Sequence, residues 1–246
     1  RGLGDVYKRQ VKSSAKKIVC GGELKEKIAA LSLDVLSMSE KEKCLYADYA
    51  ALISDLKLKP HATSFTLCLP DTDAIAVELP LLGKHSAENV ALAALLAREM
   101  GLTGEEIARG IEGIRPVPHR LQLIEGDGVY ILDDSYNANP RGAREAVEAL
   151  KRFPARKIVV TPGLVETGIL DEKLNGELGA ALVGLDEVIL VGETLVGAVK
   201  AGYLEAGGEE EKIVVLPTLD AAQTRLSETL SAGDCVLFLN DLPDAW

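Results

Sequence analysis

No run of uninterrupted apolar residues in this sequence reaches the length that a bilayer-spanning helix needs, so we expect no membrane span. Basic residues are scarce as well. The net charge is −11, and the nearest thing to a basic patch is the pair Lys16 and Lys17. Because nucleic-acid binders concentrate Lys and Arg on one surface, this balance argues against a nucleic-acid partner.

The cysteines and histidines form no metal-binding or disulfide pattern. The four cysteines are widely separated, without the paired spacing of metal ligands, and the three histidines are dispersed. The sequence therefore predicts no metal cluster. Cysteines that outline no disulfide framework are typical of a reduced compartment, so we expect a cytoplasmic protein.

The start of the chain lacks both an initiator methionine and a signal-peptide pattern. Residues 1–10 look like a translated sequencing-adapter scar, and we interpret them as a non-native leader in front of an N-terminally truncated fragment. The composition, 47% hydrophobic and 26% charged, is that of a folded chain. At 246 residues the chain can hold one large or two modest domains.

Residues 11–115 contain short strand candidates and two helices. Segments 64–69 and 74–79 alternate apolar and polar residues, which predicts two paired strands with a turn between them. Segment 86–100 is apolar on almost all sides, as a fully buried helix would be. Segment 103–113 opens with a capping-box pattern and predicts a second helix.

Pro116 and Pro118 stand one residue apart and predict a linker over 114–120. Beyond it, strand and helix patterns alternate, which is typical of a mainly parallel sheet covered by helices on both faces. The strand candidates are 128–133, 157–161, 187–191, 212–216 and 234–239. The helix candidates are 140–153, 173–183, 195–206 and 218–231. The predicted fold class is α/β, with a Rossmann-like C-terminal domain over 116–246.

The segment from Asp133 to Pro140, DDSYNANP, stands between a strand candidate and a helix candidate. Asn139 suits the N-cap of that helix, and Pro140 suits its first position. Two carboxylates, a phenol and two amides thus gather at the carboxyl end of a strand, where open α/β sheets place their ligands. An aspartate there can bind the vicinal hydroxyls of a ribose. The structural alternative is an ordinary polar turn with an asparagine cap.

Two residues elsewhere could serve such a site. The amide of Asn89, near the start of the apolar helix, matches a backbone carbonyl and an adenine edge equally well. Arg120 follows the linker, where an arginine either pairs with an acid of the neighbouring domain or binds a phosphate with its planar fork. Loops 161–168 and 240–244 follow later strands and are either ligand loops or plain turns.

Three segments resemble motifs of the Mur ligase family. Segment 82–89, LGKHSAEN, is similar to the G-x-H-N-x-x-N element that closes the family's central ATPase domain, with Ser86 where asparagine is usual. Segment 118–122, PHRLQ, is similar to a G-R-L segment, with His119 where glycine is usual. DDSYNANP is similar to the signature of the branch that adds D-alanyl-D-alanine.

The resemblance covers roughly residue 60 to the end, and it implies a nucleotide site. By it, Asn89 would meet adenine, Arg120 would reach the phosphates and Asp134 would bind the ribose. The residues implied around the nucleotide are Asn89, Arg120, Asp134, Tyr136, Asn137 and Asn139. Residues 11–115 would be the end of the central ATP-binding domain. The resemblance points to no catalytic residue within this chain.

The implied activity is ATP-dependent amide-bond formation in peptidoglycan precursor synthesis, by a monomer. The substrates would be a UDP-N-acetylmuramoyl peptide and D-alanyl-D-alanine. In the family, the phosphate-binding loop and the Mg²⁺ ligands lie upstream, and this sequence has neither G-x-x-x-x-G-K-[ST] nor G-x-G-x-x-G. We therefore expect the polypeptide as given to be inactive alone.

Two other interpretations stay open. One is another Mur-type amino-acid ligase, similar to folylpolyglutamate synthase, against which the YNAN of residues 136–139 argues. The other is a non-catalytic α/β module that binds adenosine.

Overall fold

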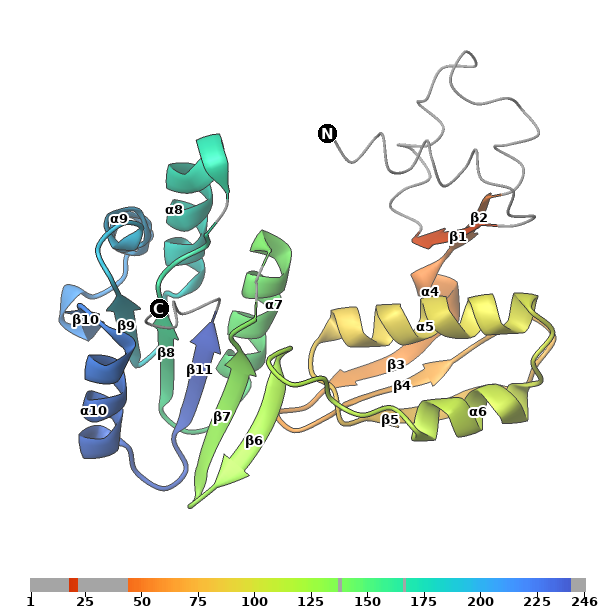
Figure 1. Cartoon of the computed structure of the whole chain (residues 1–246). Helices are drawn as coiled ribbons and strands as arrows, with labels where there is room; N and C mark the ends of the chain where they lie inside the picture. Colours follow the sequence, from red (N-terminus) through yellow and green to blue (C-terminus); the bar gives the residue numbers. More distant parts are fainter. Residues whose placement is uncertain (1–17, 22–43, 137–138, 166, 240–246) are drawn as a thin grey trace, which may run out of the picture. The chain divides into compact units, whose positions relative to one another are not determined.

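The computed structural model describes residues 18–21, 44–136, 139–165 and 167–239, which fall into two compact units (Figure 1). Each unit is described by itself. The first comprises Arg1–Lys57, Thr63–Leu79 and His85–Ile114, and the second comprises Leu58–Ala62, Pro80–Lys84 and Arg115–Trp246. None of the described helices is long and apolar enough to cross a membrane.

The described residues of the first unit form a three-stranded sheet, a separate parallel strand pair and three helices. The pair is β1 (Ile18–Gly21) and β2 (Cys44–Ala47), followed by the short α4 (Tyr49–Leu52). The sheet has the order β3-β4-β5, with β3 (Ile53–Leu58), β4 (Thr63–Leu67) and β5 (Ile75–Leu79). The longer helices are α5 (Lys84–Glu99) and α6 (Gly104–Glu112). The antiparallel pairing of β4 with β5 confirms the predicted strand pair.

The capping box predicted for the second helix is present at the start of α6. The Thr103 hydroxyl accepts a hydrogen bond from the Glu106 N–H at 3.2 Å, and the Glu106 carboxylate accepts one from the Thr103 N–H at 2.8 Å. These bonds satisfy two N–H groups that a helix start otherwise leaves without partners. The hydrogen bonds from the Thr103 backbone and hydroxyl also hold the pKa of the Glu106 carboxyl below its usual value.

The expectation that helix 86–100 is buried on all sides is wrong. In the described part of the chain, α5 exposes Asn89 and Ala93, and Leu96 is 45% exposed. One face is buried, through Ala87, Val90, Ala91, Ala94 and Leu95. Alanine and leucine occur on both the buried and the exposed face of this helix, so the apolar pattern alone does not distinguish the face that packs from the face that does not.

The second unit is a six-stranded sheet with helices on both faces. Its strands are β6 (Gln122–Gly126), β7 (Val129–Asp134), β8 (Lys157–Thr161), β9 (Glu187–Val191), β10 (Ile213–Leu216) and β11 (Cys235–Leu239). Its helices are α7 (Pro140–Lys151), α8 (Asp171–Ala181), α9 (Val196–Glu205) and α10 (Leu219–Thr229), with short 3₁₀ turns at Gly168–Leu170 and Glu210–Lys212. The strand order is β10-β9-β8-β11-β7-β6.

This sheet confirms the predicted α/β fold class. Neighbouring strands are parallel except for β6, which pairs antiparallel with β7 at the edge of the sheet. Strand β6 was not among the predicted strands. Its residues are half-buried or exposed, as is usual for an edge strand, so they lack the apolar run that identified the others.

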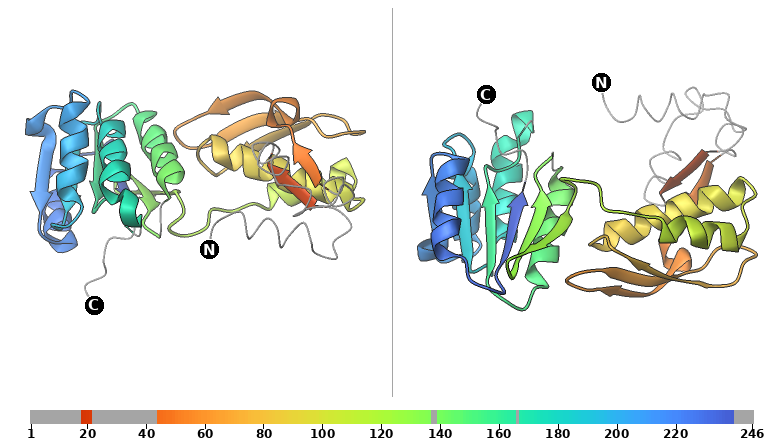
Figure 2. Two further views of the ribbon diagram at one scale, coloured as in Figure 1. Left: turned by 90° about the horizontal axis from the view of Figure 1, so that it is seen from above. Right: turned by 60° about the horizontal axis from the view of Figure 1, so that its bottom comes forward.

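Alternate residues of the central strands face two separate cores. Val159, Val188 and Leu237 pack with α7, α8 and α9, whereas Ile158, Ile189 and Val236 pack with α10. Seen from above, α7, α8 and α9 stand in a row against one face (Figure 2). Strands buried on both sides explain the near-continuous apolar runs of the sequence.

Helices α8 and α9 pack against each other through glycine. A Cβ atom on Gly202 would lie 2.6 Å from the Cα of Gly176, and one on Gly179 would lie 2.7 Å from the backbone nitrogen of Tyr203. Backbones can approach this closely only where side chains are missing. Gly179 and Gly202 therefore set the distance between the two helices.

We expect Gly202→Ala to lower the free energy of unfolding by about 1–3 kcal/mol, because the added methyl group forces the two helix backbones apart. Gly197→Ala, in the same helix, is the matched control, since a Cβ there meets nothing within 4 Å. It should leave stability unchanged or slightly raised. Denaturant titrations of both variants measure the difference, and equal stability would contradict this account of the packing.

Cys235 is fully buried at the start of β11, and burial raises the pKa of its thiol to about 12. The thiol therefore stays protonated near neutral pH, and the reactive thiolate is scarce. We expect iodoacetamide to modify Cys235 only after unfolding, as measured by peptide mass spectrometry, whereas the half-buried Cys68 should react earlier. Equal modification rates in the native protein would contradict this.

Candidate functional site

The carboxyl end of β7 holds the linker against the sheet. Asp134 is the last residue of β7 and lies beside Leu239 of β11. Its Oδ1 accepts a hydrogen bond from the backbone N–H of Leu121 at 3.0 Å. Leu121 is 7% exposed and has a φ of 48°, so its side chain enters the core at the point where the linker turns into β6. Asp134 thus fixes the start of β6.

The neighbouring aspartate holds a second linker residue. Asp133 Oδ2 lies 2.8 Å from Nδ1 of His119, and its Oδ1 accepts hydrogen bonds from the hydroxyl of Ser135 at 2.7 Å and from the Ser135 N–H at 3.2 Å. His119 has a φ of 63°, which costs a residue other than glycine about 1–3 kcal/mol. The single contact with Asp133 helps to hold His119 in this conformation.

The serine, histidine and aspartate do not form a hydrolase triad. In such a triad the nucleophile and the acid contact different nitrogens of the imidazole. Here Ser135 Oγ and Asp133 both contact Nδ1 of His119, the former at 3.3 Å. The cluster therefore holds the imidazole in place but cannot relay a proton from serine to acid.

Arg120 lies between His119 and Leu121, the two residues that Asp133 and Asp134 hold. Its guanidinium carbon is 4.1 Å from the centre of the Tyr136 ring, and the Tyr136 N–H donates to the carbonyl of His119 at 3.3 Å. A planar cation stacked on an aromatic ring beside a strand's carboxyl end is suited to bind a phosphate. The structure thus brings together three of the predicted site residues, Arg120, Asp134 and Tyr136.

Asn139 has the capping role that the sequence predicted. Its Oδ1 accepts hydrogen bonds from the N–H groups of Arg141 and Gly142, at 3.1 and 2.9 Å, and Pro140 begins α7. A nucleotide contact by Asn139 stays a prediction. Asn137 lies outside the described residues.

The loop after β8 lies at the same edge of the sheet and is held by Asn175 of α8. This fully buried amide accepts from the Leu164 N–H at 2.7 Å and donates to the Leu164 carbonyl at 3.0 Å. Gly163, with a φ of 96°, leaves room for it. Asn175 therefore fixes the backbone of Leu164 at this edge. The predicted loop 240–244 lies outside the described residues.

Asn89 belongs to the first unit, where it is exposed on α5. That Asn89 binds the same nucleotide as Arg120 and Asp134 stays a prediction. Among the described residues, no group of His, Cys, Asp and Glu side chains could hold a metal ion.

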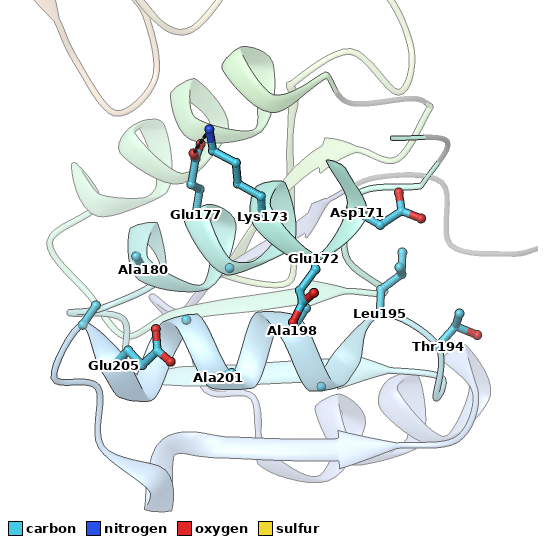
Figure 3. A pocket seen from close by; sticks show the side chains of 14 residues that line it. Asp171, Glu172, Lys173, Glu177, Ala180, Thr194, Leu195, Ala198, Ala201 and Glu205 are labelled. Carbon is cyan, nitrogen blue, oxygen red and sulfur yellow. Dashed lines mark ion pairs between the residues drawn. The ribbon is translucent and has the colours of Figure 1, made fainter. Parts of the chain in front are cut away.

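A groove of about 900 Å³ lies over α8 and α9 (Figure 3). Small residues such as Gly176 and Ala201 form part of its lining, and acids such as Glu172 and Glu205 also border it. On one side Lys173 pairs with Glu177 at 4.0 Å. The groove includes none of the residues predicted around the nucleotide.

Sequence reasoning missed the contributions of His119, Ser135 and Asn175. His119 and Asp133 are 14 residues apart and meet only because β6 folds back on β7. Asn175 sits between Leu174 and Gly176 without any motif. The only sequence signal for these contributions was His119, which stands where the similar G-R-L segment usually has glycine.

Comparisons with known proteins agree with this architecture. Residues 119–240 match the family model described as "Mur ligase, glutamate ligase domain". The UDP-N-acetylmuramoyl-tripeptide–D-alanyl-D-alanine ligase of Escherichia coli strain K12 is 34% identical over 150 residues, which are 60% of this chain and 32% of that protein. A probable bifunctional folylpolyglutamate synthase/dihydropteroate synthase of Halobacterium salinarum is 30% identical over 186 residues, covering 74% of this chain and 22% of that protein.

Among solved structures, the MurF ligase of Thermotoga maritima in complex with ADP shares the fold. Its TM-score is 0.74 at 22% identity, and the match covers 94% of this chain and 51% of that one. The chain spans about a third of the length of the Escherichia coli relative. The family model and the relatives together show that this chain belongs to the Mur ligase family, with its glutamate ligase domain in residues 119–240.

Proposed function

We propose that this chain is part of an ATP-dependent ligase that joins D-alanyl-D-alanine to a UDP-N-acetylmuramoyl tripeptide. The observation that carries the proposal is the juxtaposition of Asp134, Arg120 and Tyr136 at the carboxyl end of β7, within a DDSYNANP segment. The Escherichia coli relative, whose name states this reaction, supports the choice of substrates. We further propose a cytoplasmic monomer.

The reaction needs a held nucleotide more than it needs a reactive side chain. A substrate carboxylate attacks the γ-phosphorus of ATP, ADP leaves, and an acyl phosphate forms. The amine of the dipeptide then attacks the acyl carbon, and phosphate leaves. In this proposal Asp134 binds the ribose hydroxyls and Arg120 neutralises phosphate charge, so these residues orient ATP for in-line transfer.

The first unit would belong to the central ATP-binding domain and would bring Asn89 to the adenine. Mg²⁺ would supply charge neutralisation at the phosphates when bound. The described residues contain no cluster of acids that fits such an ion.

The second candidate is a ligase that adds glutamate, as the Halobacterium relative favours. The full-length product of the gene distinguishes the two when it is given ATP with either D-alanyl-D-alanine and the muramoyl tripeptide or L-glutamate and a folate. We expect product with D-alanyl-D-alanine and none with L-glutamate, as detected by mass spectrometry. The reverse pattern would favour the second candidate.

Substitutions of Asp134 separate its structural role from its proposed ligand role. Asp134→Ala should lower the free energy of unfolding by about 1–3 kcal/mol, because the Leu121 N–H loses its acceptor. Asp134→Asn keeps an acceptor oxygen and should cost less. Both variants should weaken ADP binding, since neither offers a carboxylate to the two ribose hydroxyls. Denaturant titration and NMR titration with ADP measure the two effects, and unchanged ADP affinity in both variants would contradict the ribose role.

We expect the 246-residue polypeptide to release no phosphate from ATP, because its sequence lacks a phosphate-binding loop. The assay combines the purified chain with ATP, Mg²⁺, UDP-muramoyl tripeptide and D-alanyl-D-alanine. Asp134→Ala serves as the background control. Substrate-dependent phosphate release above that background would show that the chain carries its own phosphate site.

A further inference from the structure

Three hydrogen-bonded contacts surround Arg120 without involving its own side chain. The residue before it, His119, is joined through Nδ1 to Asp133 at 2.8 Å. The residue after it, Leu121, donates its N–H to Asp134 at 3.0 Å. Both flanking residues have a positive φ, 63° and 48°, so the chain turns sharply on either side of Arg120. Two consecutive aspartates of one strand therefore fix the backbone of the arginine.

The third contact joins this turn to the ring on which the guanidinium rests. The Tyr136 N–H donates to the His119 carbonyl at 3.3 Å, and the guanidinium carbon of Arg120 lies 4.1 Å from the centre of the Tyr136 ring. His119 is thus tied at its side chain to β7 and at its carbonyl to the residue that supports Arg120. Loss of the imidazole would release one side of the turn.

We propose that His119 is a positioning residue for Arg120, and that its hydrogen bond to Asp133 holds the guanidinium over Tyr136, ready for a nucleotide phosphate. The phosphate part of this inference rests on the proposed function. The imidazole contributes through Nδ1, which lies against the carboxylate, while the side chain as a whole is 59% exposed. Ser135 stabilises the arrangement, because its hydroxyl donates to the other oxygen of Asp133 at 2.7 Å.

The chain offers variants that separate positioning from folding. His119→Gly removes the imidazole, and glycine adopts a φ of 63° without strain, so the fold should be retained. His119→Asn places an amide N–H where Nδ1 stands, and asparagine also tolerates a positive φ. His61→Ala is the matched control, because Nδ1 of His61 also lies against a carboxylate of the same unit, 3.3 Å from an oxygen of Glu125.

The first measurement is the NMR spectrum of the 246-residue chain without any ligand. The Tyr136 ring should shift the side-chain proton signals of Arg120 upfield, and Tyr136→Leu defines the unshifted position. We expect the shift to be lost in His119→Gly and kept in His119→Asn and His61→Ala. A shift that persists in His119→Gly, or that His119→Asn fails to restore, would overturn the proposal.

The second measurement compares ADP with adenosine in NMR titrations. His119→Gly should weaken ADP binding about fivefold, the effect of one ordinary hydrogen bond, and leave adenosine binding unchanged. His119→Asn should restore the affinity for ADP. Equal weakening of both ligands, or no weakening of ADP, would overturn the phosphate part. If the unsubstituted chain binds no ADP at all, the proposed nucleotide site fails, while the spectra without ligand still decide whether His119 positions Arg120.

Discussion

The hydrogen bond from the Leu121 N–H to Asp134 is the contact on which the edge of this sheet depends. It connects the linker to the last residue of β7 while the Leu121 side chain enters the core. The register of β6 follows from it, because Gln122 is then placed opposite Asp133. A residue that resembles a ribose ligand is therefore also a structural residue. A substitution of Asp134 that removes both the structural contact and the proposed ribose contact cannot tell the two roles apart.

Other residues of the DDSYNANP segment also have structural roles beside their proposed ligand roles. Asp133 and Asp134 alternate across the strand; Asp133 holds His119 of the linker, and Asp134 holds Leu121, which follows the linker. Asn139 caps α7, so the positive end of the helix lies at the same edge as the stacked guanidinium of Arg120. The two features favour negative charge at that place. The proposed phosphate contact depends on this arrangement.

The central strands β8, β9 and β11 were predictable because they are buried on both faces and so appear as apolar runs bounded by turns. Strand β6 was not predictable in this way, since an edge strand buries little. The exposed face of α5 was also missed, because alanines occur on both its buried and its exposed face and do not distinguish the two. The capping box at Thr103 and the cap at Asn139 were correct, since both act within four residues.

The sequence by itself determined the alternation of strands and helices, the linker prolines and the residue types of the candidate site. Each of these follows from local backbone preferences or from spacing along one element. Tertiary structure alone decided which residues meet. His119 reaches Asp133 because β6 returns beside β7, and Asn175 reaches the loop after β8 because α8 packs over the sheet. Such pairs depend on strand order and helix packing, which no spacing along the chain encodes.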